Sequence, residues 1–190
     1  LAVSGGVDSM VMLDVLVRTQ RSHRANIQVV TFDHGFRMES AAEVQFVYQV
    51  CQTYDIPCII QSLHLADGPN KQERARNARR EVLSQFDGAI ATAHHASDQA
   101  ETVLFRMLRG SGLDGLKGMS PRSERWVKPL LMEFKESIVE YANERKIEWK
   151  EDPSNRMSTR GAIRQLWSEL ERVHSNPEKS MAKVATMLSR

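Results

Sequence analysis

The chain has 190 residues, of which 26 are Lys or Arg and 24 are Asp or Glu, so its net charge is only +2. This length suffices for one domain with a hydrophobic core, and so small a charge does not by itself mark a nucleic-acid binder. No apolar run reaches the roughly eighteen residues of a membrane-spanning helix and no secretory signal is present, so we expect no membrane partner. Cys51 and Cys58 lack the spacing of a metal or redox pair, which predicts core thiols in a reduced, cytoplasmic setting. Because the chain starts at Leu1 rather than Met, we expect a domain or fragment of a longer protein.

The first expected strand, residues 1–3, runs directly into a Ser/Gly-rich loop, SGGVDS, and then into an apolar helix. Backbone N–H groups at such a turn and the dipole of the following helix favour a bound phosphate, and Gly5 and Gly6 allow close approach. The loop lacks the Gly-Lys-Ser/Thr of a Walker loop, and Asp8 stands where a lysine would be expected. A carboxylate beside phosphates indicates Mg²⁺ between them. The alternative is an ordinary helix-capping turn in which Asp8 favours the dipole.

Apolar β-branched runs alternate with helical patterns along the rest of the chain. This alternation predicts an α/β fold with a doubly wound, mostly parallel five-stranded sheet and helices on both faces, followed by a helical C-terminal segment. We expect residues 1–130 to bind ATP and residues 131–190 to complete the catalytic domain and contribute substrate contacts. Further strands are predicted at 27–32, 57–63, 89–93 and 126–127, and helices at 39–54, 71–85, 96–109, 135–145 and most of 160–190.

Polar residues follow two of these strands, at the edge of a parallel sheet where ligands bind. Asp33 begins a DHGFR segment that suits a nucleotide edge or a metal, or is simply a solvated turn. His94 and Asp98 are four residues apart and so share a face on a helical turn. A zinc site or a capping box from Ser97 to Glu101 are alternatives. We favour a polar cluster that faces the nucleotide loop and serves acid–base chemistry and Mg²⁺.

Three later segments are basic. The helix at 71–85 carries five basic residues in its first ten, which suits RNA phosphates, although a solvated helix face is the alternative. A Gly-rich stretch at 110–118 ends the helix at 96–109 and suits a lid or clamp. A turn at 151–155 feeds a helix whose arginines share a face; a capped helix start is the first interpretation and phosphate binding the second. The arginines singled out are Arg76, Arg79, Arg106, Arg109, Arg160 and Arg164.

The order of these motifs is specific. SGGVDS, DHGFR, the basic helix, HHASDQAET, RGSGLDGLKGM, KPLL, and DPSN followed by RGAIR occur in one series across nearly the whole chain. The loop resembles that of the PP-loop ATP pyrophosphatases, and the series resembles the N-terminal catalytic domain of the tRNA(Ile)-lysidine synthetases.

The resemblance implies an ATP-dependent ligase that uses Mg²⁺. ATP would adenylate the C2 oxygen of the wobble cytidine in the CAU anticodon of tRNA(Ile) and release pyrophosphate. The ε-amine of free L-lysine would then attack C2 and expel AMP. A homodimer is also implied. Two other readings stay open: a tRNA sulfur transferase with the same loop, which would use cysteine pairs and often an iron–sulfur cluster, and a non-enzymatic ATP-binding module.

The resemblance also implies roles for individual residues. The ATP-binding residues would be Ser4, Gly5, Gly6, Val7, Asp8, Ser9 and Asp33. The catalytic residues would be Asp8, Asp98, His94 and Arg160, with Asp8 and Asp98 also holding Mg²⁺. The substrate or tRNA contacts would be Arg76, Arg79, Arg106, Arg109 and Arg164.

Overall fold

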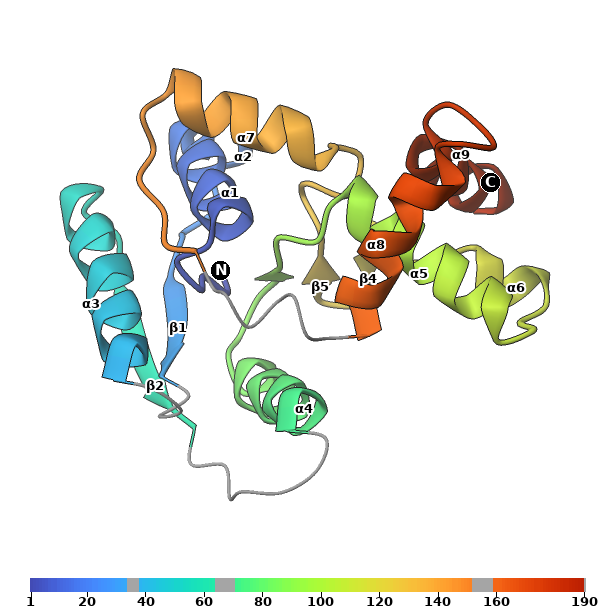
Figure 1. Cartoon of the computed structure of the whole chain (residues 1–190). Helices are drawn as coiled ribbons and strands as arrows, with labels where there is room; N and C mark the ends of the chain where they lie inside the picture. The colour runs from blue at the N-terminus through green and yellow to red at the C-terminus, as the bar shows by residue number, and fades with distance from the viewer. Residues whose placement is uncertain (34–37, 64–70, 152–158, 190) are drawn as a thin grey trace.

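Helices surround two small sheets in the computed structural model, which describes residues 1–33, 38–63, 71–151 and 159–189 (Figure 1). The first elements are α1 (Val7–Arg18), α2 (Gln20–His23), β1 (Val29–Asp33), α3 (Met38–Thr53) and β2 (Cys58–Ser62). Next come α4 (Lys71–Ser84), β3 (Ile90–Ala91), α5 (Ala96–Leu108), α6 (Leu113–Leu116), β4 (Arg122–Ser123) and β5 (Trp126–Val127). The last are α7 (Lys135–Glu144), α8 (Thr159–Leu170) and α9 (Pro177–Leu188).

The strands form two small sheets rather than the single five-stranded sheet expected from the sequence. β1 pairs in parallel with β2, while β5 pairs in parallel with β3 and antiparallel with β4. The amino-terminal segment lies between the two sheets, because the Val3 amide donates to the Val30 carbonyl (3.1 Å) and the Ala2 amide to the Ala91 carbonyl (3.0 Å). It contributes only one isolated bridge, Ala2 to Val30, since the segment is too short for a ladder. The α/β class is confirmed; a five-stranded sheet is not.

The helices predicted at 39–54, 71–85, 96–109 and 135–145 are present, with ends within about two residues of those expected. The region 160–190, expected to be mostly helical with a break at 175–177, forms two helices separated by residues 171–176. Three elements were not predicted: the short helices α2 and α6, and β4, which forms an antiparallel hairpin with β5. Glu124 has a positive φ of 53° within this hairpin. No helix of the described ranges is long and apolar enough to cross a membrane.

Helix α1 is buried on two sides, which explains its nearly unbroken apolar sequence. Met10 and Leu13 pack with β1 and α3, in a cluster that includes Val29 and Val47. Its other side packs against α7, where Val11 and Met12 share a cluster with residues of both helices, Ile138 and Ala142 among them. Burial from both sides holds the axis of α1, and therefore its amino end, in one position.

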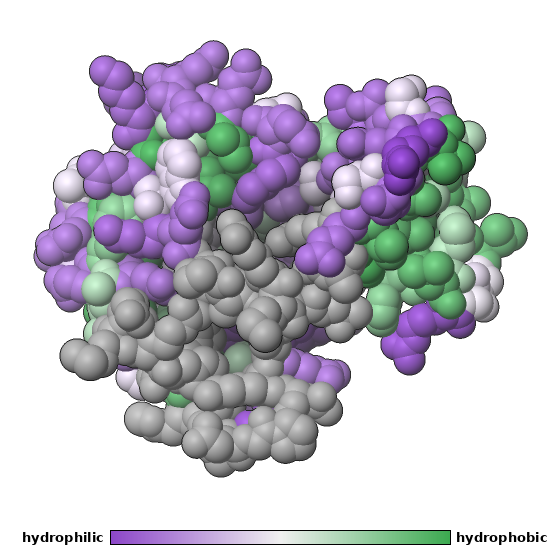
Figure 2. Space-filling model, in the orientation of Figure 1, coloured by the Kyte–Doolittle hydropathy of each residue, from purple (hydrophilic) through white to green (hydrophobic). Residues whose placement is uncertain are grey.

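The C-terminal helices form a core of their own. α5, α8 and α9 share a cluster that includes Ala100, Leu104, Trp167 and Ala182, and Figure 1 shows α9 beside α5. Figure 2 shows hydrophobic side chains exposed on this side of the molecule, over α5 and α6, whereas the opposite side is mostly hydrophilic. This core fixes the direction of α5, whose amino end faces the loop described next.

Candidate functional site

The loop between the amino-terminal segment and α1 is tightly turned and held by its own serines. Gly5 has a φ of +86°, which a residue with a side chain rarely adopts, and Gly6 is the residue that precedes α1. The Ser9 hydroxyl donates to the Gly6 carbonyl (2.9 Å) and accepts from the Ser4 amide (3.1 Å). The loop therefore opens onto the first turn of a twelve-residue helix, a place that attracts anions.

Two more helices begin beside this loop. The Ala96 amide at the start of α5 donates to the carbonyl of Glu133 (2.7 Å), just before α7. The Lys135 amide at the start of α7 donates to Ser97 Oγ (3.3 Å) in α5. α7 also packs along α1. The amino ends of α1, α5 and α7 thus converge, and each adds positive potential to the same place.

The side chains at this junction form a chain of charged groups. Lys135 Nζ lies 2.6 Å from Asp8 Oδ1, across 127 residues of sequence. His95 Nε2 lies 3.7 Å from Asp8 Oδ1 and 3.6 Å from Asp98 Oδ2. The predicted carboxylates Asp8 and Asp98 are therefore brought to one site, but on either side of His95.

His95 is fixed by its position at the start of α5. Its Nδ1 accepts from the Asp98 amide (3.4 Å), and Asp98 Oδ2 accepts from the His95 amide (3.1 Å), which together make a capping box. The capping box considered from Ser97 to Glu101 is therefore wrong by two residues at its start, because α5 begins at Ala96. Since Nδ1 accepts, the proton of the neutral ring belongs on Nε2, which faces the two carboxylates.

His94, the histidine predicted from the spacing, has a different environment. Its Nδ1 lies 3.0 Å from the Thr92 hydroxyl, in the turn between β3 and α5. The signal that could have identified His95 instead is its place immediately before the helix, where a side chain can accept from the first turn. Lys135 follows the KPLL motif at the start of a predicted helix, but nothing in the local sequence links it to Asp8.

A family model described as a PP-loop domain matches residues 1–170. The chain belongs to the PP-loop family. The resemblance expected from the motifs is confirmed as well, because the similar curated proteins are named tRNA(Ile)-lysidine synthase.

Three such relatives illustrate the similarity. The protein of Thermosipho africanus is 41% identical over 165 residues, which are 82% of this chain and 39% of the relative. The protein of Novosphingobium aromaticivorans is 40% identical over 167 residues, which cover 82% of this chain and 50% of the relative. The protein of Anaplasma marginale is 39% identical over 166 residues, which cover 82% of this chain and 36% of the relative. The chain thus spans half or less of the length of these relatives.

A solved structure has the same fold. The U34-tRNA thiolase NcsA from Methanococcus maripaludis, with its 4Fe-4S cluster, superposes with a TM-score of 0.79 over 99% of this chain and 70% of that chain. Sequence identity is 19%, so this similarity concerns the PP-loop architecture alone.

The remaining ATP-site predictions lie at the same sheet edge or in the core beneath it. Asp33 ends β1, and its carbonyl accepts from the Leu63 amide (2.8 Å) where β2 ends. The side chain of Val7 is buried in the core between α1 and α7, so only its backbone faces the loop. Residues 34–37 of the DHGFR motif lie outside the described ranges.

The predicted arginines of α5 lie at its far end, away from the PP-loop. Arg106 Nη1 donates to the carbonyls of Gly115 (2.7 Å) and Gly118 (3.2 Å), and Gln99 bonds both backbone groups of Met119. The Gly-rich stretch is thus held against α5, and a Cβ at Gly118 would lie 2.6 Å from the Gln99 amide oxygen. The Arg109 guanidinium lies over the Phe105 ring.

The other predicted arginines come from α4 and α8. Arg79 donates to the Ala75 carbonyl (3.3 Å) within α4. Burial, and then the neighbouring positive charge of Arg76, lower the pKa of Arg79 below its usual range. Arg160 and Arg164 lie in α8, but their side chains are outside the described part, as is the DPSN motif. Their relation to the PP-loop stays a prediction.

A second carboxylate of α1, Asp14, holds three helices together. It is 1% exposed and accepts from Arg18 Nε (2.8 Å), Tyr54 Oη (2.7 Å) and Tyr141 Oη (2.8 Å). Burial raises the pKa of Asp14, but the hydrogen bonds from Tyr54, Arg18 and Tyr141 outweigh it and lower the pKa overall. Because Tyr54 follows α3 and Tyr141 is in α7, Asp14 fixes α7, and with it Lys135, relative to α1.

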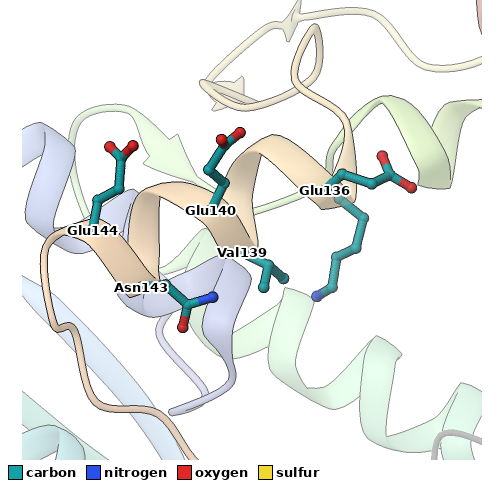
Figure 3. A pocket seen from close by; sticks show the side chains of 6 residues that line it. Glu136, Val139, Glu140, Asn143 and Glu144 are labelled. Atoms are coloured by element: carbon teal, nitrogen blue, oxygen red, sulfur yellow. The ribbon is translucent and has the colours of Figure 1, made fainter.

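An open groove of about 720 Å³ runs along α7, from Lys135 at the junction to Glu144. In Figure 3, Glu136, Glu140 and Glu144 project from this helix. A row of carboxylates repels phosphate, so the groove is not where we place a nucleotide.

A metal at this junction would depend on few protein ligands. Among the described residues, no group of three or more His, Cys, Asp and Glu side chains is arranged to hold a metal ion. Mg²⁺ commonly takes one or two protein carboxylates and completes its shell with phosphate oxygens and water. Asp8, in the first turn beside the loop, fits that pattern.

Proposed function

We propose that this chain carries the catalytic centre of a tRNA(Ile)-lysidine synthase. The C2 oxygen of the wobble cytidine attacks the α-phosphorus of ATP, the bond to pyrophosphate breaks, and AMP is joined to the base. The ε-amine of free L-lysine then attacks C2, and AMP leaves with the bonding electrons. The observation that carries the proposal is the convergence of three helix amino ends on the SGGVDS loop, with Asp8, His95 and Lys135 side by side.

The loop residues would hold the phosphates through their backbone amides, and Ser4 and Ser9 would add hydroxyl contacts. Asp8 would be the principal ligand of Mg²⁺, which when bound offsets phosphate charge. His95 Nε2 lies between Asp8 and Asp98, where its N–H points toward both carboxylates and can keep them in position. In this proposal His94, Arg160 and Asp33 complete the site at the carboxyl ends of the strands.

We propose that α4 and the β4–β5 hairpin receive the tRNA. The Arg80 guanidinium lies 5.1 Å from the Trp126 ring, and Arg125 bonds the carbonyls of Ser84 and Gly88, which docks the hairpin on α4. Burial and the charge of Arg80 lower the pKa of Lys128, as burial and Arg76 do for Arg79. Cations crowded together in this way gain stability when an RNA phosphate arrives. Arg109 and Arg164 are further proposed contacts, and Arg106 shapes the Gly-rich loop.

Residues 131–190 complete this centre rather than forming a separate module. Their α7 supplies Lys135 to a loop built from residues 1–130, which is the organisation we propose for the catalytic domain. We further propose that the two sheets act as one through the amino-terminal segment between them. A cytoplasmic enzyme agrees with free thiols at both Cys51 and Cys58.

Thiolation is a weaker candidate. The chain has only two cysteines, and both lie in the core between α3 and the sheet. Cys58 begins β2, opposite the strand ends that carry the PP-loop site. The Cys51 thiol donates to Cys58, which raises the pKa of Cys51 and lowers that of Cys58. A pair so placed lacks the four ligands that an iron–sulfur cluster usually takes.

The test measures incorporation of radiolabelled L-lysine into a tRNA(Ile) transcript with a CAU anticodon, in the presence of ATP and Mg²⁺. A tRNA(Met) transcript is the control for specificity. Incorporation into tRNA(Ile) establishes the function, and incorporation into both places the discrimination in parts of the relatives beyond this region. Pyrophosphate release that depends on tRNA, without incorporation of lysine, would retain adenylation and overturn lysine as nucleophile. The absence of both would leave an ATP-binding module. The homodimer implied by the resemblance is tested by the mass of the purified protein in solution.

A further inference from the structure

The PP-loop of this chain contains no positively charged side chain. Residues 4–9 supply backbone amides, two hydroxyls and one carboxylate. The Walker loop, by contrast, carries its own lysine, which contacts the β- and γ-phosphates. A triphosphate has a high negative charge, and its departure as pyrophosphate concentrates that charge on one leaving group. A cation from elsewhere in the chain would supply the side-chain charge that this loop lacks.

Lys135 is in the right place to be that cation. Its Nζ lies 2.6 Å from Asp8 Oδ1, in the first turn of the helix that the loop opens onto. Its backbone is anchored independently of this contact, because its amide donates to Ser97 Oγ and the next turn of α7 buries Ile138 against α1. The side chain can thus change partner while its base stays fixed.

We propose that Lys135 is the phosphate-binding lysine of this PP-loop, held by Asp8 in the free protein and transferred to the β- and γ-phosphates of ATP in the complex. This inference rests on the proposed use of ATP at the site. As the bond from the α-phosphorus to the bridging oxygen breaks, the electron pair stays on the pyrophosphate oxygen, and the Lys135 ammonium stabilises that charge. Lysine is well suited to this task as a compact, mobile point charge.

The ion pair is of a kind that exchanges readily. The side chains of Lys135 and Asp8 are 40% and 29% exposed, so water already solvates both. Ion pairs this accessible contribute little net free energy, and losing one costs the protein little. When Mg²⁺ binds Asp8, Lys135 loses its carboxylate and gains phosphate oxygens as the nearest anions. The free-state pair keeps Asp8 compensated until the nucleotide arrives.

The experiment measures binding by calorimetry for the wild-type protein and three variants, with Mg²⁺-ATP, Mg²⁺-pyrophosphate, Mg²⁺-AMP and Mg²⁺ alone as the probes. Lys135→Met should weaken ATP and pyrophosphate by at least about tenfold, the scale of one charged hydrogen bond. It should leave AMP within about twofold, because AMP lacks the phosphates that Lys135 contacts. Mg²⁺ alone should bind more tightly to this variant, since Lys135 no longer competes for Asp8. If Lys135 had only a structural role, its loss would not change the affinities for pyrophosphate and for Mg²⁺ in opposite directions.

Two further variants make the result specific. Lys135→Arg keeps the charge and should recover much of the affinity for pyrophosphate. Lys150→Met is the matched control. Lys150 lies over the ring of Phe46, which packs beside Gly5, so this substitution removes one charge near the loop without affecting the partner of Asp8. It should bind all four probes as the wild type does. If Lys150→Met and Lys135→Met lower the affinity for pyrophosphate equally, the overall positive charge near the loop explains the effect and the proposal is overturned.

The proposal would also be overturned if Lys135→Met lowered the affinities for AMP and pyrophosphate equally, or if it bound pyrophosphate as tightly as the wild type does. Thermal unfolding checks that the variants are folded, and Lys135→Gln replaces the Met variant should that one unfold. The proposed function is tested separately, by lysine incorporation into tRNA. If the wild-type protein binds ATP but forms no lysidine, the proposed function is refuted, and the binding data still decide the role of Lys135.

Discussion

Helix α1 carries two carboxylates whose surroundings are opposite. Asp8, in its first turn, is partly exposed and lies beside the half-exposed Lys135 and near His95. Asp14, six residues later, is 1% exposed and accepts from one arginine and two tyrosines of three different segments. The first has a partner that a ligand can replace. The second has partners that belong to the fold.

The difference shows how one helix can serve both stability and function. A buried carboxylate with several donors cannot bind a substrate without breaking the packing around it, because each abandoned donor loses a buried partner. A carboxylate at an exposed helix start can exchange its partner at small cost. Asp14 therefore fixes the position of α1 against α7, and Asp8 and Lys135 use that fixed geometry.

The sharpest test of this contrast is Asp8→Asn. The change removes the charge that would hold Mg²⁺ and keeps the size of the side chain, so we expect adenylation to fall by about 10³-fold or more. The free energy of unfolding should change by less than about 1 kcal/mol, because an exposed ion pair contributes little. Tracking pyrophosphate release and urea unfolding on the same sample measures both. Turnover near that of the wild type in a folded variant would remove Asp8 from the mechanism.

Asp14→Ala should have the reverse effect. It leaves the hydroxyls of Tyr54 and Tyr141 and the Arg18 guanidinium without their common acceptor, and opens a small cavity between the helices. We expect a loss of about 3 kcal/mol in the free energy of unfolding, typical for breaking a buried polar network. Affinity for ATP in the folded protein should change much less. Urea unfolding followed by circular dichroism provides the measurement, and a loss below about 1 kcal/mol would contradict the role given to Asp14.

The contrast also marks what the sequence could and could not predict. The position of the SGGVDS loop and of Asp8 before a helix could be predicted from the sequence, because the apolar segment, the turn and the helix start are contiguous and their backbone geometry depends on neighbouring residues. Helix positions were readable from apolar spacing, as α1, α5 and α7 illustrate. The ion pair of Lys135 with Asp8 spans 127 residues and depends on how α7 packs on α1, which local patterns do not encode.

Two further differences have the same origin. The spacing of His94 and Asp98 predicted one polar face, but the capping role of His95 depends on where α5 begins, and helix ends are the least certain part of such a prediction. Arg106 stays a predicted substrate contact, but the sequence did not show that its Nη1 donates to Gly115 and Gly118, because that depends on the fold of the Gly-rich stretch. A single five-stranded sheet is not confirmed, because the amino-terminal segment between the two sheets makes only one isolated bridge.

His95→Asn separates capping from chemistry within the same junction. Asn caps helices well, so the free energy of unfolding should change by less than about 0.5 kcal/mol. The ring nitrogen between Asp8 and Asp98 is lost, and removal of a group that orients metal-binding carboxylates typically costs about 10- to 100-fold in activity. The measurements are lysine incorporation at saturating ATP over a range of pH, and thermal unfolding. A variant that loses stability but retains its rate would show that His95 is only a cap.

The smallest expected effect is the dependence of stability on pH that Asp14 provides. The pKa of Asp14 in the folded protein is below the usual aspartate value of 3.8, so in acid the unfolded chain binds a proton at this residue more readily than the folded one. The contribution is therefore complete above about pH 5 and is lost as the pH falls through the folded pKa.

Asp14→Asn lacks this titration. The difference in unfolding free energy between wild type and Asp14→Asn should stay constant from about pH 5 to 8 and shrink below about pH 4. Parallel urea titrations at each pH isolate this residue, because the other carboxylates are common to both proteins and cancel in the difference. A difference that stays constant to the lowest pH at which both proteins fold would mean that Asp14 is not held as the charged acceptor of its three donors.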